Sequence, residues 1–217
     1  MDSTTIDRLD DEGNVISLLR VIYWEEPTAA LLGRLVESAP VAEENALDRG
    51  LNTLLGAARR NRDRLGAYGE ELAVEFAGLF IGPRQPPAVP FASFYLSETA
   101  TLMSDVTIDV RKRYLAAGLA VRDLNRLPDD HVAVELEFID FVVRKCVGAF
   151  RAGEREVAAG SFRHLESFFT EHFSRWTPKF AQHVIDAGPG DFYRGAGMML
   201  KELGTRLGPL EAMPARG

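Results

Sequence analysis

Asp130 and His131 are adjacent side chains that suggest proton-transfer chemistry. A carboxylate can orient an imidazole that exchanges protons near neutral pH, as general acid or base catalysis requires. Adjacent residues at a helix start point in different directions, however, and the sequence places no serine or cysteine nucleophile beside them. We therefore interpret the pair first as a helix cap with a hydrogen-bonded histidine, next as a binding pair, and last as a catalytic one.

Other reactive side chains point to no known catalytic or metal-binding pattern. Helical bundles that hold two metal ions use Glu-x-x-His pairs. None of the four histidines has a glutamate three residues before it: His131, His164, His172 and His183. The single cysteine, Cys146, excludes an internal disulfide and a multi-cysteine cluster within one chain, and we interpret it as a buried apolar residue. We expect no metal, no cofactor and no enzymatic activity.

The sequence contains neither of two common phosphate-binding motifs. Gly195-Ala196-Gly197 lacks the third glycine of a dinucleotide fingerprint and follows no strand, and the sequence has no Walker-type loop. We interpret the glycines as a place where two helices approach closely.

The composition predicts a globular protein of mildly acidic charge. The 217 residues include 25 Lys and Arg against 32 Asp and Glu, for a formal net charge of -7. Such a balance argues against nucleic-acid binding and suits a cationic partner better. The sequence shows neither a signal-peptide pattern at its start nor an apolar stretch of spanning length, so we expect a cytoplasmic protein without stable membrane insertion.

Helical periodicity accounts for the apolar residues throughout, and no segment alternates as a strand does, so an all-α fold is predicted. A first helix is expected over about 14–24. A central, strongly apolar helix is expected to start at Pro128, and a short helix is expected to be capped by Thr177 with Pro178 in its first position.

One helix ends in Leu79-Phe80-Ile81-Gly82-Pro83, and four of the eight residues from Pro83 to Pro90 are proline. Such a loop is stiff before anything binds. It leads into Phe91. A rigid loop beside an apolar helix end can hold apolar side chains open to a partner at little entropic cost, which indicates the wall of a binding groove.

Four motifs in this order carry a resemblance to a known family. They are Phe76 to Pro83, Pro90 to Tyr95, the Leu-Pro-Asp-Asp-His and Glu-Leu-Glu-Phe residues of Leu127 to Phe138, and the segments His172 to Phe180 and Asp191 to Arg194. With them, from about Val15 to Leu203, the chain resembles the TorD/DmsD-like redox-enzyme maturation chaperones, which proofread twin-arginine signal peptides.

The resemblance implies a compact multi-helix bundle, a single all-helical domain over 1–217. The connection at 125–130 could divide it into an N-terminal lobe of about 14–124 and a C-terminal lobe of about 128–207. The same connection would be the hinge of a domain-swapped dimer, with a monomer as the alternative.

The implied function is to bind the twin-arginine signal peptide of a molybdopterin-containing oxidoreductase subunit and to delay export until the cofactor is loaded. An assembly chaperone that recognises the body of the redox-enzyme subunit is the alternative. A small helical nucleotide hydrolase is a third, weaker one. The resemblance places peptide binding at nine residues: Tyr23, Phe76, Leu79, Phe80, Pro90, Phe91, Pro128, Asp130 and His131.

Overall fold

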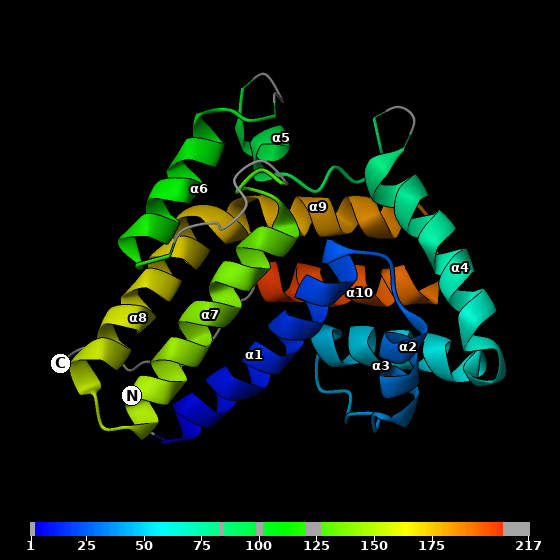
Figure 1. Cartoon of the computed structure of the whole chain (residues 1–217), viewed down its shortest axis with the longest axis horizontal. Helices are drawn as coiled ribbons and strands as arrows, with labels where there is room; N and C mark the ends of the chain where they lie inside the picture. The colour runs from blue at the N-terminus through cyan, green and yellow to red at the C-terminus, as the bar shows by residue number, and fades with distance from the viewer. Residues whose placement is uncertain (1–2, 83–84, 99–101, 120–126, 206–217) are drawn as a thin grey trace. The chain divides into compact units, whose positions relative to one another are not determined.

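The structure is a computed structural model that describes residues 3–82, 85–98, 102–119 and 127–205. The prediction of an all-α fold is confirmed, because these residues form helices and no strand (Figure 1). The α-helices are α1 (Ser3–Trp24), α2 (Ala29–Glu37), α3 (Ala46–Arg60), α4 (Leu65–Phe76), α5 (Ala92–Leu96), α6 (Asp105–Ala116), α7 (Val132–Arg151), α8 (Arg155–Phe168), α9 (Ser174–Asp186) and α10 (Asp191–Thr205). A 3-10 turn, η1 (Arg62–Arg64), and two π-helical turns, η2 (Ala77–Ile81) and η3 (Phe169–Phe173), complete the elements.

The chain divides into two compact units. Unit 1 contains α1 up to Arg20 together with Phe91–Trp176, and unit 2 contains Val21–Pro90 together with Thr177–Thr205. The described residues on both sides of the connection at 125–130 belong to unit 1, and residues 125 and 126 lie outside the described residues. The two units have other bounds than the predicted lobes, and the single domain, the lobes and the hinge all remain predictions.

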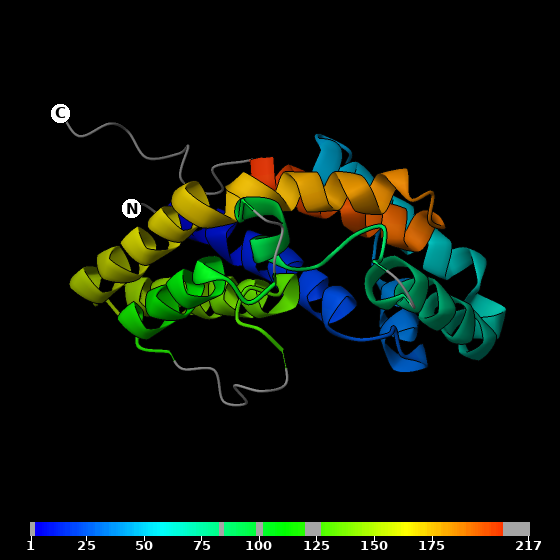
Figure 2. The same ribbon diagram turned by 90° about the horizontal axis from the view of Figure 1, so that it is seen from above.

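Unit 1 is built around α7, as expected for the most apolar helix of the chain. α7 packs along α8 (Figures 1 and 2) and buries Leu136, Ile139 and Val143 completely or almost so. From α1, Gly13 faces Val143, and the Ser17 hydroxyl donates a 2.7 Å hydrogen bond to Asp140. The middle of α1 and the middle of α7 therefore pack together.

Unit 2 depends on the packing of α3 against α10. α3 begins with a capping box in which the Asn45 side chain accepts from the backbone of Asp48, whose own side chain accepts from the backbone of Asn45. Gly50 and Gly195 lie at the crossing, where a Cβ on Gly195 would stand 2.5 Å from the Gly50 carbonyl oxygen. The predicted close approach of two helices at Gly195 is confirmed.

Three predicted helix starts are wrong. α1 begins at Ser3, eleven residues before the start expected at Asn14, because its polar first half still buries Ile6 and Leu9. α7 begins at Val132, since Pro128 to Asp130 form a turn in front of it.

α9 begins at Ser174 and has Pro178 inside it. The π turn η3 leads directly into α9, so no cap is needed at Thr177. Pro178 has no N–H to bond to the carbonyl four residues earlier, so one hydrogen bond is missing within the helix.

Candidate functional site

Five aromatic rings of unit 2 form a cluster around Phe80. The Phe80 ring centroid lies 5.1 Å from Phe76, 5.6 Å from Tyr23, 5.7 Å from Tyr193 and 6.1 Å from Phe180. Most of these pairs are edge-on or tilted, which aromatic quadrupoles favour. Three residues expected at the peptide site, Tyr23, Phe76 and Phe80, are therefore brought together and are buried.

The Tyr23 hydroxyl is buried in this cluster without a hydrogen-bond partner. Burial raises the pKa of Tyr23 far above its ordinary value, so the phenol stays protonated and can donate. The neighbouring Tyr193 hydroxyl, in contrast, donates to the Leu72 carbonyl at 3.2 Å. A buried polar group without a partner costs roughly 1–3 kcal/mol, so an acceptor reaching Tyr23 would gain about that much.

The π turn η2 continues α4 and carries Leu79 and Phe80. It ends at Gly82, whose φ of 55° lies in the left-handed region that favours glycine. The Ala88 N–H then donates to the Leu79 carbonyl at 3.2 Å, so the proline-rich segment returns onto η2. Leu79 and Pro90 are both buried, and Pro83 lies outside the described residues.

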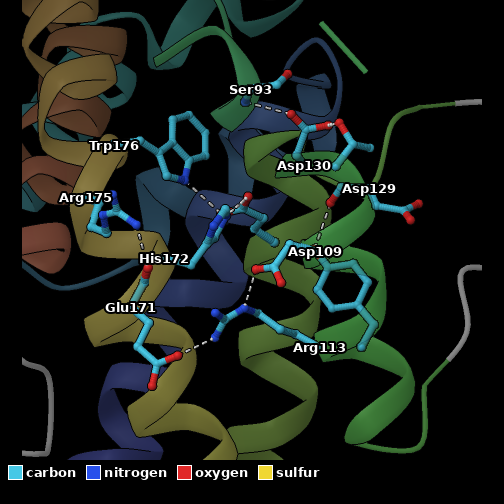
Figure 3. A network of polar contacts seen from close by, with 12 residues as sticks. Ser93, Asp109, Arg113, Asp129, Asp130, Glu171, His172, Arg175 and Trp176 are labelled. Carbon is cyan, nitrogen blue, oxygen red and sulfur yellow. Dashed lines mark hydrogen bonds and ion pairs between the residues drawn. The ribbon is translucent and has the colours of Figure 1, made fainter. Parts of the chain in front are cut away.

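In unit 1, the turn from Pro128 to His131 is fixed to the start of α5. The Asp130 carbonyl accepts from the Ala92 N–H at 2.9 Å, and the Asp130 carboxylate accepts from the Ser93 N–H and the Thr107 hydroxyl, both at 2.8 Å (Figure 3). Asp130 is fully buried, and each of its carboxylate oxygens has a donor. Its side chain therefore holds α5, α6 and the turn together.

His131 is the N-cap of α7. Its Nδ1 accepts from the Ala133 N–H at 3.2 Å, and its ring meets the half-buried Phe91 ring edge-on at 5.0 Å. Phe91 and His131 also form an isolated antiparallel bridge. Burial lowers the pKa of His131 to about 4, so the imidazole is neutral at physiological pH and able to cap. The interpretation of Asp130 and His131 as a helix cap with a hydrogen-bonded histidine is confirmed.

Asp129 carries a second polar contact of the same turn. One carboxylate oxygen pairs with Arg111 of α6, and the Tyr114 hydroxyl donates to the Asp129 carbonyl at 2.8 Å. The other carboxylate oxygen is buried without a partner. In the Pro-Asp-Asp-His segment, the first aspartate therefore contacts α6, and the second contacts both α5 and α6.

A buried polar triad behind this turn was missed by the sequence interpretation. Glu135 of α7 accepts from Trp176 Nε1 at 3.0 Å and contacts His172 Nε2 at 2.7 Å. All three side chains are buried, and Figure 3 shows His172 and Trp176 on neighbouring turns of the chain. Desolvation raises the pKa of Glu135. Glu135 itself could have indicated the triad in the sequence, since a carboxylate on the buried face of an apolar helix requires hydrogen-bond partners.

The nine predicted peptide-binding residues fall into two groups. Unit 2 holds Tyr23, Phe76, Leu79, Phe80 and Pro90, and unit 1 holds Phe91, Pro128, Asp130 and His131. Within each unit most of them are neighbours. Phe91 and Pro128 are the two with partly exposed side chains, and the other seven are buried. Their role in peptide binding stays a prediction.

The described residues show neither a metal-ligand cluster nor a membrane-spanning helix. No group of three or more His, Cys, Asp or Glu side chains is arranged to hold a metal ion there. No helix of that part of the chain is both long and apolar enough to cross a membrane. Cys146 is buried as expected, and its thiol contacts the Ala158 carbonyl.

Comparison with known proteins gives the family. The model of the nitrate reductase delta subunit family matches residues 42–182. The TorD chaperone protein of Vibrio parahaemolyticus is 28% identical over 162 residues, which cover 75% of this chain and 74% of that protein. That of Aliivibrio fischeri is 28% identical over 172 residues, covering 79% and 75%. The chain therefore belongs to the nitrate reductase delta subunit family and, as its motifs predict, to the TorD/DmsD-like redox-enzyme maturation chaperones.

Proposed function

We propose that this protein is a cytoplasmic chaperone that binds the twin-arginine signal peptide of a molybdopterin-containing oxidoreductase subunit. It would delay export of that precursor until the cofactor is loaded and the subunit has folded. The similarity to TorD chaperones supports a role in redox-enzyme maturation. The identification of the signal peptide as the bound segment is the more specific part of the proposal.

The observation that carries the proposal is the fixed position of Phe91. This ring is partly exposed, yet it is held edge-on by the buried His131, and the backbone beside it is fixed by Asp130. An apolar side chain that is already immobile loses little entropy on binding. Phe91 is therefore suited to contact the apolar run of a signal peptide, while Asp130 and His131 act as positioning residues.

Within unit 2, the aromatic cluster around Phe80 contains a hydrogen-bond donor of its own, the Tyr23 hydroxyl. An opening that let a peptide reach Tyr23 would give the buried hydroxyl the acceptor that it lacks. Each large apolar side chain that a peptide buries contributes roughly 1.5–3 kcal/mol. Ordering the peptide costs on the order of 2–5 kcal/mol, so binding should be reversible, as release of a mature precursor requires.

A matched pair of variants tests the proposal. The protein is titrated with a fluorescently labelled twin-arginine signal peptide of a molybdopterin oxidoreductase subunit. Phe91→Ala should weaken binding about tenfold, which is about 1.4 kcal/mol. Phe94→Ala is the control, since Phe94 is also a partly exposed ring of the same segment but packs on Tyr95. Its affinity should equal that of the unchanged protein.

Two outcomes would contradict the proposal. One is the absence of saturable binding of the signal peptide to the unchanged protein. The other is tight binding of the oxidoreductase subunit regardless of whether its signal peptide is present, which would favour recognition of the subunit body. Circular dichroism of both variants shows whether a loss of affinity reflects a loss of fold.

A further inference from the structure

The outward face of α4 and η2 is apolar where a surface helix normally carries charge. Val74 in α4 is 76% exposed, and Ile81 in η2, seven residues later, is 61% exposed. Gly78 lies between them, with no atom within 4 Å of where its Cβ would stand. Helices at a protein surface place polar residues outward, so folding of unit 2 does not account for these two side chains.

The same helix is acidic and lacks basic residues. α4 contains three glutamates, and neither lysine nor arginine occurs in it. Arg64 binds both carboxylate oxygens of Glu71 at 2.7 Å, and Glu75 accepts from the Gly190 N–H. Glu70 is exposed, and no hydrogen bond or ion pair joins it to the described part of the chain. It lies four residues before Val74 and hence on the same face.

This face is separate from the buried residues on the other side of the same element. Phe76, Leu79 and Phe80 point into unit 2 and are at most 8% exposed. A peptide that approaches this element from solvent therefore meets Val74 and Ile81 first. Exposed apolar residues gathered on one face, next to an acidic group, are typical of an interaction surface.

We infer that Glu70, Val74 and Ile81 form a docking face for the signal peptide, with Glu70 binding an arginine and Val74 and Ile81 covering the apolar run. This inference rests on the proposed function. Charge complementarity supports it, because a twin-arginine signal peptide is basic first and apolar afterwards, and the face is acidic at Glu70 and apolar from Val74 onward. The peptide would therefore run in the same direction as α4.

The test is a titration of folded variants with the labelled signal peptide. Val74→Asp and Ile81→Asp should each weaken binding about tenfold, as expected when one apolar side chain is lost from an interface. Glu70→Arg should weaken it about fivefold. Leu115→Asp is the matched control, because Leu115 is 57% exposed on α6 of unit 1. Its affinity should not change.

A charge exchange separates specific contact from a general effect of net charge. A peptide whose two arginines are replaced by glutamate should bind Glu70→Arg more tightly than it binds the unchanged protein. The inference is overturned if the signal peptide binds the unchanged protein while all three variants on the face bind equally well. It is also overturned if Val74→Asp and Ile81→Asp change only self-association, measured by light scattering. If the unchanged protein binds no signal peptide, the proposed function falls as well.

Discussion

Substitution of Gly195 by alanine tests the helix crossing on which unit 2 depends. A Cβ at this position would stand 2.5 Å from the Gly50 carbonyl oxygen and 2.8 Å from the Leu54 backbone nitrogen. Both neighbours are backbone atoms within α3, so neither can move aside as the end of a side chain can. The two helices must separate by several tenths of an ångström or more.

The expected cost is at the upper end of that of an overpacked core, about 3 kcal/mol. Gly148→Ala in α7 is the matched control, since no atom lies within 4 Å of the added methyl group there. Alanine is the better helix former, so this control should be stabilised by about 0.5–1 kcal/mol. The assay is urea unfolding followed by far-ultraviolet circular dichroism.

The two glycine substitutions should therefore change the free energy of unfolding in opposite directions. The reasoning is refuted if Gly195→Ala unfolds within about 0.5 kcal/mol of the unchanged protein, the range of ordinary surface substitutions. The double variant Gly50→Ala/Gly195→Ala should cost less than the sum of the single variants, because the first substitution already separates the helices.

Substitutions at three other residues address the buried polar groups. Glu135→Leu should lower the free energy of unfolding by about 3–5 kcal/mol, because it leaves Trp176 and His172 without their buried partner. Glu135→Gln should lower it less. Equal urea midpoints for these variants and the unchanged protein would argue against the triad. His131→Asn keeps an N-cap but removes the titration. The free energy of unfolding of the unchanged protein should fall by on the order of 3 kcal/mol as the pH falls from 6.5 to about 4, because the unfolded chain takes up a proton on His131 before the folded one does. The free energy of unfolding of the variant should fall less over this pH range. Tyr23→Phe removes the unpartnered hydroxyl and should raise the thermal midpoint slightly while weakening signal-peptide binding; a lower midpoint would show that the hydroxyl has an acceptor.

The sequence predicted the fold class and several helix ends because these depend on neighbouring residues. Thr28 caps α2, and its hydroxyl accepts from the Leu31 N–H at 3.2 Å. Gly118, with a φ of 86°, follows α6, as is usual for a glycine after the last turn of a helix. The cap at His131 obeys the same rule, that a polar residue precedes an apolar run, although the helix was expected to start at Pro128.

Other features depend on contacts distant in sequence and could not be predicted in this way. The π turns η2 and η3 continue α4 and α8 directly, and no proline marks their start. The donors to the Asp130 carboxylate, Ser93 and Thr107, lie far from it along the chain, so neighbouring residues do not indicate them. Periodicity indicates which face of a helix is buried and gives no partner for the polar groups on it.

The division of the chain into two discontinuous units has a consequence for synthesis on the ribosome. No single cut yields one unit alone, because each combines an early and a late segment. The face of α3 that holds Gly50 meets Gly195 only after most of the chain has been made. At typical rates of translation this wait is roughly ten to thirty seconds, during which the apolar side of α3 lacks its partner helix. Unit 2 of this protein, itself a member of a chaperone family, should therefore complete its core only after α10 has been synthesised.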